Sequence, residues 1–255
     1  MSDTADYRSR PDAHLDPIVA ARYDHSNRDR FAPQTLGPTV EVLAELAGDG
    51  TAVEFAVGTG RVALALAERG VRVLGIDFSE PMLAELRTKD ASSSVAITHG
   101  DMTTTQVCSD AKLVYLVFNS LANLRDQALQ VACFMNAAAH LTSGGRFVIE
   151  QNVPKLHRLP PGETVRAFQV SPDHLGFDEL VDPANQISVS HHYYIDGDRV
   201  AVYSPSFRYV WPSERDLMAQ LAGMELESRW ADWDRSPFGG DSPAQLSVWR
   251  KVRSP

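Results

Sequence analysis

Short apolar runs alternate with amphipathic segments between residues 53 and 150. Apolar runs of strand length occupy residues 53–57, 71–76, 95–98, 113–118 and 146–150. Apolar residues at helical spacing fill the intervals at residues 61–69, 80–89 and 126–141. Ser79 precedes the second of these helical segments and is predicted to cap it. Strands that alternate with helices at short spacing predict a parallel sheet with helices on both faces, an open doubly wound α/β fold.

The pattern changes after residue 150. Residues 151–185 are rich in Pro, His and Asp and are predicted to be irregular. Alternating residues at 187–195 and 199–211 flank Asp196-Gly197-Asp198 and predict an antiparallel hairpin. We therefore expect one domain with a hairpin inserted at about residues 186–211, after the fifth strand.

The C-terminal part supplies the remaining elements. Ser213 is predicted to cap a helix over residues 214–222. Residues 225–230 and 245–252 predict two final strands, which bring the count in the main sheet to seven.

Helical patches at residues 18–23 and 39–46 precede the first strand. We expect residues 1–48 to form a helical lid across the carboxyl edge of the sheet. Residues 49–255 would then form the ligand-binding domain together with the inserted hairpin.

Composition narrows the classes of partner. The net charge is −9, and no run of Lys or Arg forms a basic patch, which disfavours nucleic acid and anionic membranes as partners. No segment reaches the ~18 apolar residues of a membrane span. The polar N-terminus lacks an apolar signal core, so we expect a cytoplasmic protein. The two cysteines, Cys108 and Cys133, lack metal-ligand spacing, and we expect no metal site.

The loop after the first apolar run has the chemistry of a nucleotide site. Gly58-Thr59-Gly60 permits close approach of backbone N–H groups, and Asp77 follows the next strand, where a carboxylate can bind ribose hydroxyls. The same residues fit a dinucleotide fingerprint, so a nicotinamide-dependent oxidoreductase is a credible alternative. Glu54 opposes it, because pyrophosphate repels a nearby carboxylate, whereas the cationic amino and sulfonium groups of S-adenosylmethionine favour one.

The order of these features resembles class I S-adenosylmethionine-dependent methyltransferases over residues 50–152 and the terminal strands. Residues 54–60 look like the family's first motif, Gly100-Asp101-Met102 like its adenine loop, and residues 141–145 like its turn before strand five. Ala56 departs from the glycine that the family often has there. The resemblance implies a seven-stranded Rossmann-like methyltransferase sheet that binds S-adenosylmethionine and releases S-adenosylhomocysteine. It implies cofactor contacts from Glu54, Ala56, Gly58, Gly60, Asp77, Phe78, Met82, Asp101, Met102 and Phe118.

Candidates for the acceptor site follow the fourth and fifth strands or precede the first. Catalytic contacts are expected from Phe118, Asn119, Glu150, Tyr7 and Tyr23. The hairpin adds His192, Tyr194 and Tyr209 as possible walls. Methyl transfer from a sulfonium is an in-line displacement, so alignment in a water-poor site can supply much of the catalysis.

The N-terminal lid and the inserted hairpin are similar, more loosely, to small-molecule N-methyltransferases of amino-sugar and antibiotic pathways. The hypothesis is methylation of an amine nitrogen of a small natural-product or amino-sugar-like molecule, by a chain that can form a homo-oligomer. Three alternatives stay open: a small-molecule O-methyltransferase, the oxidoreductase, and a module that binds the cofactor without turnover.

Overall fold

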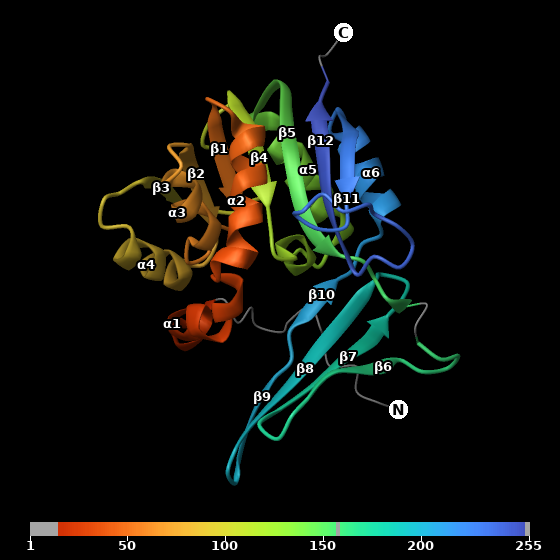
Figure 1. The fold of residues 1–255 in the computed structure, drawn as a ribbon. Coiled ribbons are helices and arrows are strands. Elements are labelled where there is room, and N and C mark those ends of the chain that lie inside the picture. The colour runs from red at the N-terminus through yellow and green to blue at the C-terminus, as the bar shows by residue number, and fades with distance from the viewer. Residues whose placement is uncertain (1–14, 157–158, 253–255) are drawn as a thin grey trace.

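The computed structural model describes residues 15–156 and 159–252. Within them, helices flank a seven-stranded main sheet, and a second, antiparallel sheet stands at its carboxyl edge (Figure 1). The strand order of the main sheet is β11-β12-β5-β4-β1-β2-β3. The bounds are β1 Thr51–Phe55, β2 Arg72–Asp77, β3 Val95–His99, β4 Ala111–Leu116, β5 Leu141–Asn152, β11 Met224–Trp230 and β12 Ala244–Lys251.

The order in which the strands are added to the main sheet reverses beside β1, at a topological switch point. From β1 the chain passes outward through β2 and β3, then returns to β4 on the other side of β1, and these strands and β5 are parallel. β12 runs antiparallel to both β5 and β11. In open α/β sheets, ligands bind beyond the carboxyl ends of the strands at such a switch point. The structure confirms the seven-stranded Rossmann-like fold expected from the sequence.

Helices cover both faces of the main sheet. One face carries α2 (Pro33–Ala47), α3 (Arg61–Ala67) and α4 (Glu80–Lys89), and the other carries α5 (Gln127–His140) and α6 (Pro212–Leu221) (Figure 1). The strands between them are apolar on both faces because both faces are buried.

The two predicted N-terminal helices are present but differ in role. α1 (Pro17–Ser26) lies at the carboxyl edge next to α4, and the short helix η2 (Arg28–Arg30) joins it to α2. α2 belongs to the core of the main sheet, where Leu43 is fully buried. None of the described helices is long and apolar enough to cross a membrane.

The second sheet is larger than the hairpin expected from the sequence. It comprises β6 (Val165–Val170), β7 (His174–Asp182), β8 (Ile187–Asp196), β9 (Arg199–Tyr203) and β10 (Ser206–Arg208). The prediction that residues 151–185 are irregular was wrong, because this range contains β6 and β7. β6 is exposed along its whole length, and a register shift between Ala167 and Gln169 interrupts its alternation of apolar and polar residues. The hairpin's second strand is split into β9 and β10 around Pro205, which has no N–H to donate to a ladder.

Helix caps follow the sequence in one case and not in the other. Ser79 caps α4 as predicted, since its Oγ accepts a hydrogen bond from the backbone N–H of Met82 at 3.2 Å. The cap predicted at Ser213 was wrong. α6 begins two residues earlier than predicted, at Pro212, and its N-cap is Trp211, because proline suits the first turn of a helix.

The loop after β1 has left-handed backbone at three alternating positions. The φ angles are 53° at Ala56, 56° at Gly58 and 82° at Gly60. A Cβ on Gly60 would lie 2.2 Å from Cδ1 of Leu86, so this glycine also allows α3 to approach α4. Ala56 adopts its left-handed conformation against the ordinary preference of an L-residue, which costs roughly 1–2 kcal/mol.

Ala56→Gly is expected to leave the free energy of unfolding unchanged or to raise it by up to about 1 kcal/mol, because glycine adopts φ > 0 without a steric penalty. Ala65→Gly, inside α3, is the matched control and is expected to lower it by about 1 kcal/mol. Urea denaturation of both variants measures the difference. Equal destabilisation by the two substitutions would contradict the strain assigned to Ala56.

Candidate active site

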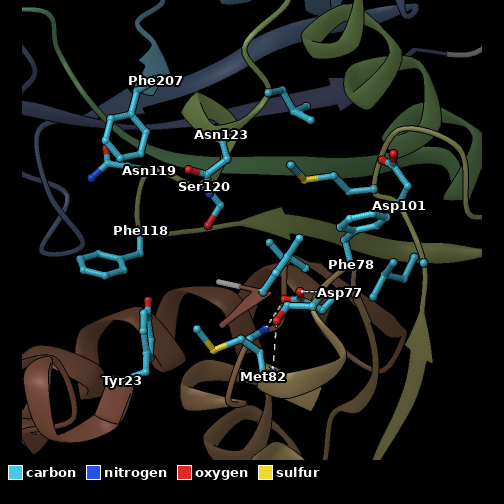
Figure 2. Close-up of a pocket in the computed structure, with 18 residues that line it drawn as sticks. Tyr23, Asp77, Phe78, Met82, Asp101, Phe118, Asn119, Ser120, Asn123 and Phe207 are labelled. Atoms are coloured by element: carbon cyan, nitrogen blue, oxygen red, sulfur yellow. Dashed lines mark hydrogen bonds between the residues drawn. The ribbon is translucent and has the colours of Figure 1, made fainter. Parts of the chain in front are cut away.

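A cavity of ≈ 370 Å³ lies at the carboxyl edge of the main sheet, lined by residues that follow β1, β2, β3 and β4 (Figure 2). This volume is within the range typical of small-molecule sites. Ten of the residues predicted from the sequence line it: Tyr23, Ala56, Gly58, Asp77, Phe78, Met82, Asp101, Met102, Phe118 and Asn119. Glu54, Gly60 and Glu150 lie outside its wall, and Tyr7 lies outside the described residues.

Asp77 joins the ends of β1 and β2 at the centre of the cavity wall. Its Oδ2 accepts a hydrogen bond from the N–H of Gly58 at 2.7 Å, and its Oδ1 accepts one from the N–H of Ser79 at 2.8 Å. The carboxylate therefore fixes the glycine loop and the start of α4 relative to each other. A ribose diol in this cavity would meet a carboxylate that is already oriented.

The loop after β3 forms one end of the cavity, where Asp101 and Phe78 lie beside each other (Figure 2). Oδ1 of Asp101 accepts hydrogen bonds from the N–H and the Oγ1–H of Thr103, so Oδ2 remains available to accept from a ligand. Nδ2 of Asn136 donates to the carbonyl oxygen of Met102 at 2.9 Å and holds this loop against α5. The arrangement fits a planar base with an exocyclic amino group.

Glu54 lies beneath the glycine loop, inside the sheet, and it does not face the cavity as expected. Its side chain is fully buried, and Oε2 accepts a hydrogen bond from the Tyr115 hydroxyl at 2.9 Å. Burial raises the pKa of Glu54 to about 8, against the opposing effects of Tyr115 and the Arg61 cation. Tyr115 was not singled out from the sequence because it lies within an otherwise apolar strand.

The turn after β4 is strained. Phe118 and Asn119 both have left-handed backbone, with φ of 58° and 64°. Oε2 of Glu150 accepts a hydrogen bond from the N–H of Phe118 at 3.0 Å, and Oδ1 of Asn119 accepts one from the N–H of Asn152 at 2.6 Å. The expectation that Glu150 contacts the acceptor is thus corrected for the structure as it stands: its carboxylate supports this turn.

A second cavity of ≈ 270 Å³ lies next to Phe118 and has Glu150, Arg30 and Arg61 in its wall. The guanidinium carbons of Arg30 and Arg61 lie 4.8 and 5.7 Å from the centre of the Phe118 ring. Arg61 also donates to the carbonyl oxygen of Arg30 at 3.4 Å. Sequence analysis missed both arginines, although a cation directly after Gly60 was a usable signal.

α1 is fastened to the glycine loop by Asp24. Its Oδ1 accepts a hydrogen bond from Thr59 Oγ1 at 2.5 Å, and its Oδ2 pairs with Nζ of Lys89 at 2.6 Å. The neighbouring Tyr23 lines the cavity, and burial raises the pKa of its phenol to about 12. The hydroxyl therefore stays protonated near neutral pH and can donate a hydrogen bond, but it is not a ready base.

The second sheet contributes Phe207 of β10 to the cavity (Figure 2). His192, Tyr194 and Tyr209, which were predicted as possible walls, do not line it. Within the described residues, no three His, Cys, Asp or Glu side chains gather as a metal site would require.

The difference in free energy of unfolding between Glu54→Gln and the wild type is expected to change with pH, in favour of the variant as the pH increases. The raised pKa keeps folded Glu54 protonated, whereas the unfolded chain ionises above about pH 4.5, so the wild type loses stability between about pH 5 and about pH 8. A neutral amide does not titrate. The free energy of unfolding of the variant minus that of the wild type should therefore increase by at least about 1.4 kcal/mol over this pH range, the equivalent of one pKa unit.

Urea denaturation at several pH values measures this difference. Glu41→Gln, an exposed position in α2, is the control and should show no such increase. A pH-independent difference for Glu54→Gln would mean that Glu54 is ionised in the folded protein.

Comparison with known proteins finds similar methyltransferases. Residues 52–145 match the methyltransferase domain family. The structure of the CcbJ methyltransferase from Streptomyces caelestis is 33% identical, with a TM-score of 0.76 over 84% of this chain and 94% of that one. The cypemycin N-terminal methyltransferase of a Streptomyces species is 26% identical over 204 residues, 78% of this chain and 82% of that protein.

A further structure shares the fold. CalS10, an amino pentose methyltransferase from Micromonospora echinaspora in a structure with S-adenosylmethionine bound, is 19% identical, with a TM-score of 0.71 over 90% of this chain and 96% of that one. These likenesses, together with the loop after β1, Asp77 and the loop after β3, decide against the nicotinamide alternative. The chain belongs to the class I methyltransferase family, and its cofactor is S-adenosylmethionine.

Proposed function

We propose that this methyltransferase methylates the amine nitrogen of a small natural-product-like molecule. The observation that carries the proposal is the chemistry around the Phe118 end of the cavity. There the wall contains the amides Asn119 and Asn123, the hydroxyl of Ser120 and the ring of Phe207. Among the residues described there, the one titratable side chain is Tyr23, whose phenol stays protonated.

A neutral amine brings its own lone pair, whereas an ordinary hydroxyl needs a base to remove its proton. Asp77 and Asp101 are the carboxylates in the cavity wall, and both hold backbone N–H groups on the side where the ribose and the adenine would lie. The bound cofactor supplies an electrophilic methyl group. The chain's own task is to orient an unprotonated amine and to exclude water, and the amide oxygen of Asn123 suits an N–H group of that amine.

The curated relative supports nitrogen as the acceptor atom. The cypemycin enzyme is named for methylation at an N-terminus, which is an amine on a larger molecule. O-methylation of a small molecule is the alternative, and it is disfavoured because the described residues at the Phe118 end of the cavity wall include no ready base.

A lid within residues 1–48 is proposed to close the site on the domain of residues 49–255, and α1 is its moving part because α2 packs in the core of the main sheet. α1 carries Tyr23 into the cavity wall, and Asp24 fastens this helix to Thr59 of the glycine loop. Closure over a bound cofactor and acceptor would exclude water from the reacting atoms.

Purified protein is expected to transfer a labelled methyl group from S-adenosylmethionine to amines in a panel of amino sugars and short peptides with free N-termini. Matched analogues that carry a hydroxyl in place of the amine are the control and should remain unlabelled. For an amine acceptor, the rate should rise with pH until the acceptor's own pKa is passed, because only the neutral amine attacks. Labelling of the hydroxyl analogues alone would overturn the proposal in favour of O-methylation.

Asp77→Asn is expected to weaken the binding of S-adenosylhomocysteine at least about tenfold, because hydrogen bonds to a charged group contribute about 1.5–3 kcal/mol. Isothermal titration calorimetry measures the affinity. Asp241→Asn, an exposed position between β11 and β12, is the matched control and should bind like the wild type. An unchanged affinity for Asp77→Asn would remove Asp77 from the ribose site.

A further inference from the structure

The Phe118 end of the cavity, where the proposed function places the acceptor, is built from two segments that are far apart in the sequence. The short helix η3 (Ser120–Asn123) supplies Ser120 and Asn123, and β10 supplies Phe207. β10 packs against η3, and Figure 2 shows Phe207 at the same end of the cavity as Ser120 and Asn123. The width of this end therefore depends on what holds β10 against η3.

A buried glutamine of α5 contacts the first of these segments. Gln130 lies near the start of α5, and its side chain is fully buried. Its Nε2 group donates hydrogen bonds to the carbonyl oxygens of Leu121, at 3.3 Å, and Leu124, at 3.1 Å. Because helical side chains lean toward the N-terminus of their helix, Gln130 reaches back over the segment that precedes α5. Its amide therefore holds η3 and the residue that follows it.

The same amide group holds β10. Nε2 of Gln130 also donates to the carbonyl oxygen of Arg208, at 3.4 Å, and its Oε1 accepts a hydrogen bond from Nη1 of Arg208. Side chains alternate along a strand, so the Arg208 side chain points into the body of the protein while Phe207 points into the cavity. One side chain thus joins the direct neighbour of Phe207 to η3.

Arg208 is held in place by further partners, so it can anchor β10. Its Nη2 donates to Oε1 of Glu214 and to Oε1 of Gln186, at 2.6 Å in each case. The Glu214 carboxylate neutralises the buried guanidinium, which removes most of the cost of burying that charge. Arg125, which follows η3, donates to Oγ of Ser206 at 3.1 Å and adds a second link between the two segments.

The hydrogen bonds of Gln130 account for an amide at a fully buried helix position. A buried amide is costly unless its N–H and C=O groups find partners. Both polar atoms of the Gln130 side chain have them. Gln151 and Gln245 are also buried, yet within the described part of the chain each leaves one side-chain polar atom without a partner. Gln130 is therefore matched to the groups around it, and these belong to the two segments of the cavity wall.

We propose that Gln130 is a positioning residue for the methyl acceptor: its amide sets the separation between Phe207 and η3, and hence which acceptors fit in line with the methyl group. This role rests on the proposed placement of the acceptor at the Phe118 end, but not on whether the acceptor atom is nitrogen or oxygen. Asp77 and Asp101, on the cofactor side, accept their hydrogen bonds from other residues. The affinity for the cofactor is therefore expected to be independent of Gln130.

Gln130→Met tests the proposal, because methionine is also unbranched and of similar length but cannot form these hydrogen bonds. One amino sugar and one short peptide that the wild type methylates are compared by the ratio of their kcat/KM values. A misplacement of about 1 Å can change a rate ~100-fold, so we expect this ratio to change at least about tenfold. The affinity for S-adenosylhomocysteine should stay within about twofold of the wild type. Gln245→Met, at another buried glutamine, is the matched control and should leave the ratio unchanged.

The ratio separates positioning from stability, because a loss of folded enzyme lowers both rates by the same factor. An unchanged ratio for a Gln130 variant that binds S-adenosylhomocysteine would overturn the proposal. Gln130→Asn, whose amide is one methylene shorter, replaces Gln130→Met if that variant fails to bind the ligand. If the hydroxyl analogues alone are labelled, the proposed N-methylation fails, and the ratio measured on two of those analogues still tests Gln130.

Hydrogen exchange tests the joint between the two segments without any acceptor. With S-adenosylhomocysteine bound, the amides of residues 120–124 and 206–208 are expected to exchange at least about tenfold faster in Gln130→Met than in the wild type, because both segments lose a hydrogen-bond partner. Gln245→Met should exchange like the wild type over these residues. Unchanged exchange in both segments of Gln130→Met would overturn the proposal, whether or not an acceptor is found.

Discussion

The site depends on the carboxylate of Asp77. It receives the N–H of Gly58 from one side and the N–H of Ser79 from the other, so a single side chain joins the loop after β1 to the start of α4. Without that bridge, the N–H of Gly58, which has left-handed backbone, would lose its acceptor. The adjacent strands and helices bring Asp77 to this point, and the cavity opens where it ends.

Arg61 and Asp24 are two charged residues that contact the loop after β1 and its surroundings. Arg61 acts on three groups at once: it opposes the raised pKa values of Glu54, Tyr23 and Tyr115, and it lies over the Phe118 ring. Asp24 fastens α1 from above through Thr59. A cationic cofactor would therefore enter a site in which the carboxylates of the cavity wall, Asp77 and Asp101, already accept hydrogen bonds from backbone or hydroxyl groups.

Elements with local signals were predictable from the sequence, and contacts made across distance were not. The strand–loop–helix order, the cap at Ser79 and the positions of Gly58 and Asp77 all follow from short-range pattern and were confirmed as fold features. β6 was not predicted because it is exposed along its whole length and a register shift between Ala167 and Gln169 interrupts its alternation of apolar and polar residues. The hydrogen bond that Glu150 accepts was not predictable, because its donor, the N–H of Phe118, is 32 residues away. This N–H belongs to a strained turn for which the residue types give no signal.

The strained turn after β4 lies between the cofactor side and the acceptor side of the cavity. Phe118 and Asn119 follow β4 at the point where the cofactor side of the cavity passes into the acceptor side, and β5 holds both of them, through Glu150 and the N–H of Asn152. Left-handed backbone in two successive non-glycine residues costs energy and persists because the neighbouring strand supplies partners. The cost secures the Phe118 ring in a fixed position between Arg30, Arg61 and the cavity, so this part of the cavity wall is held by the main sheet itself.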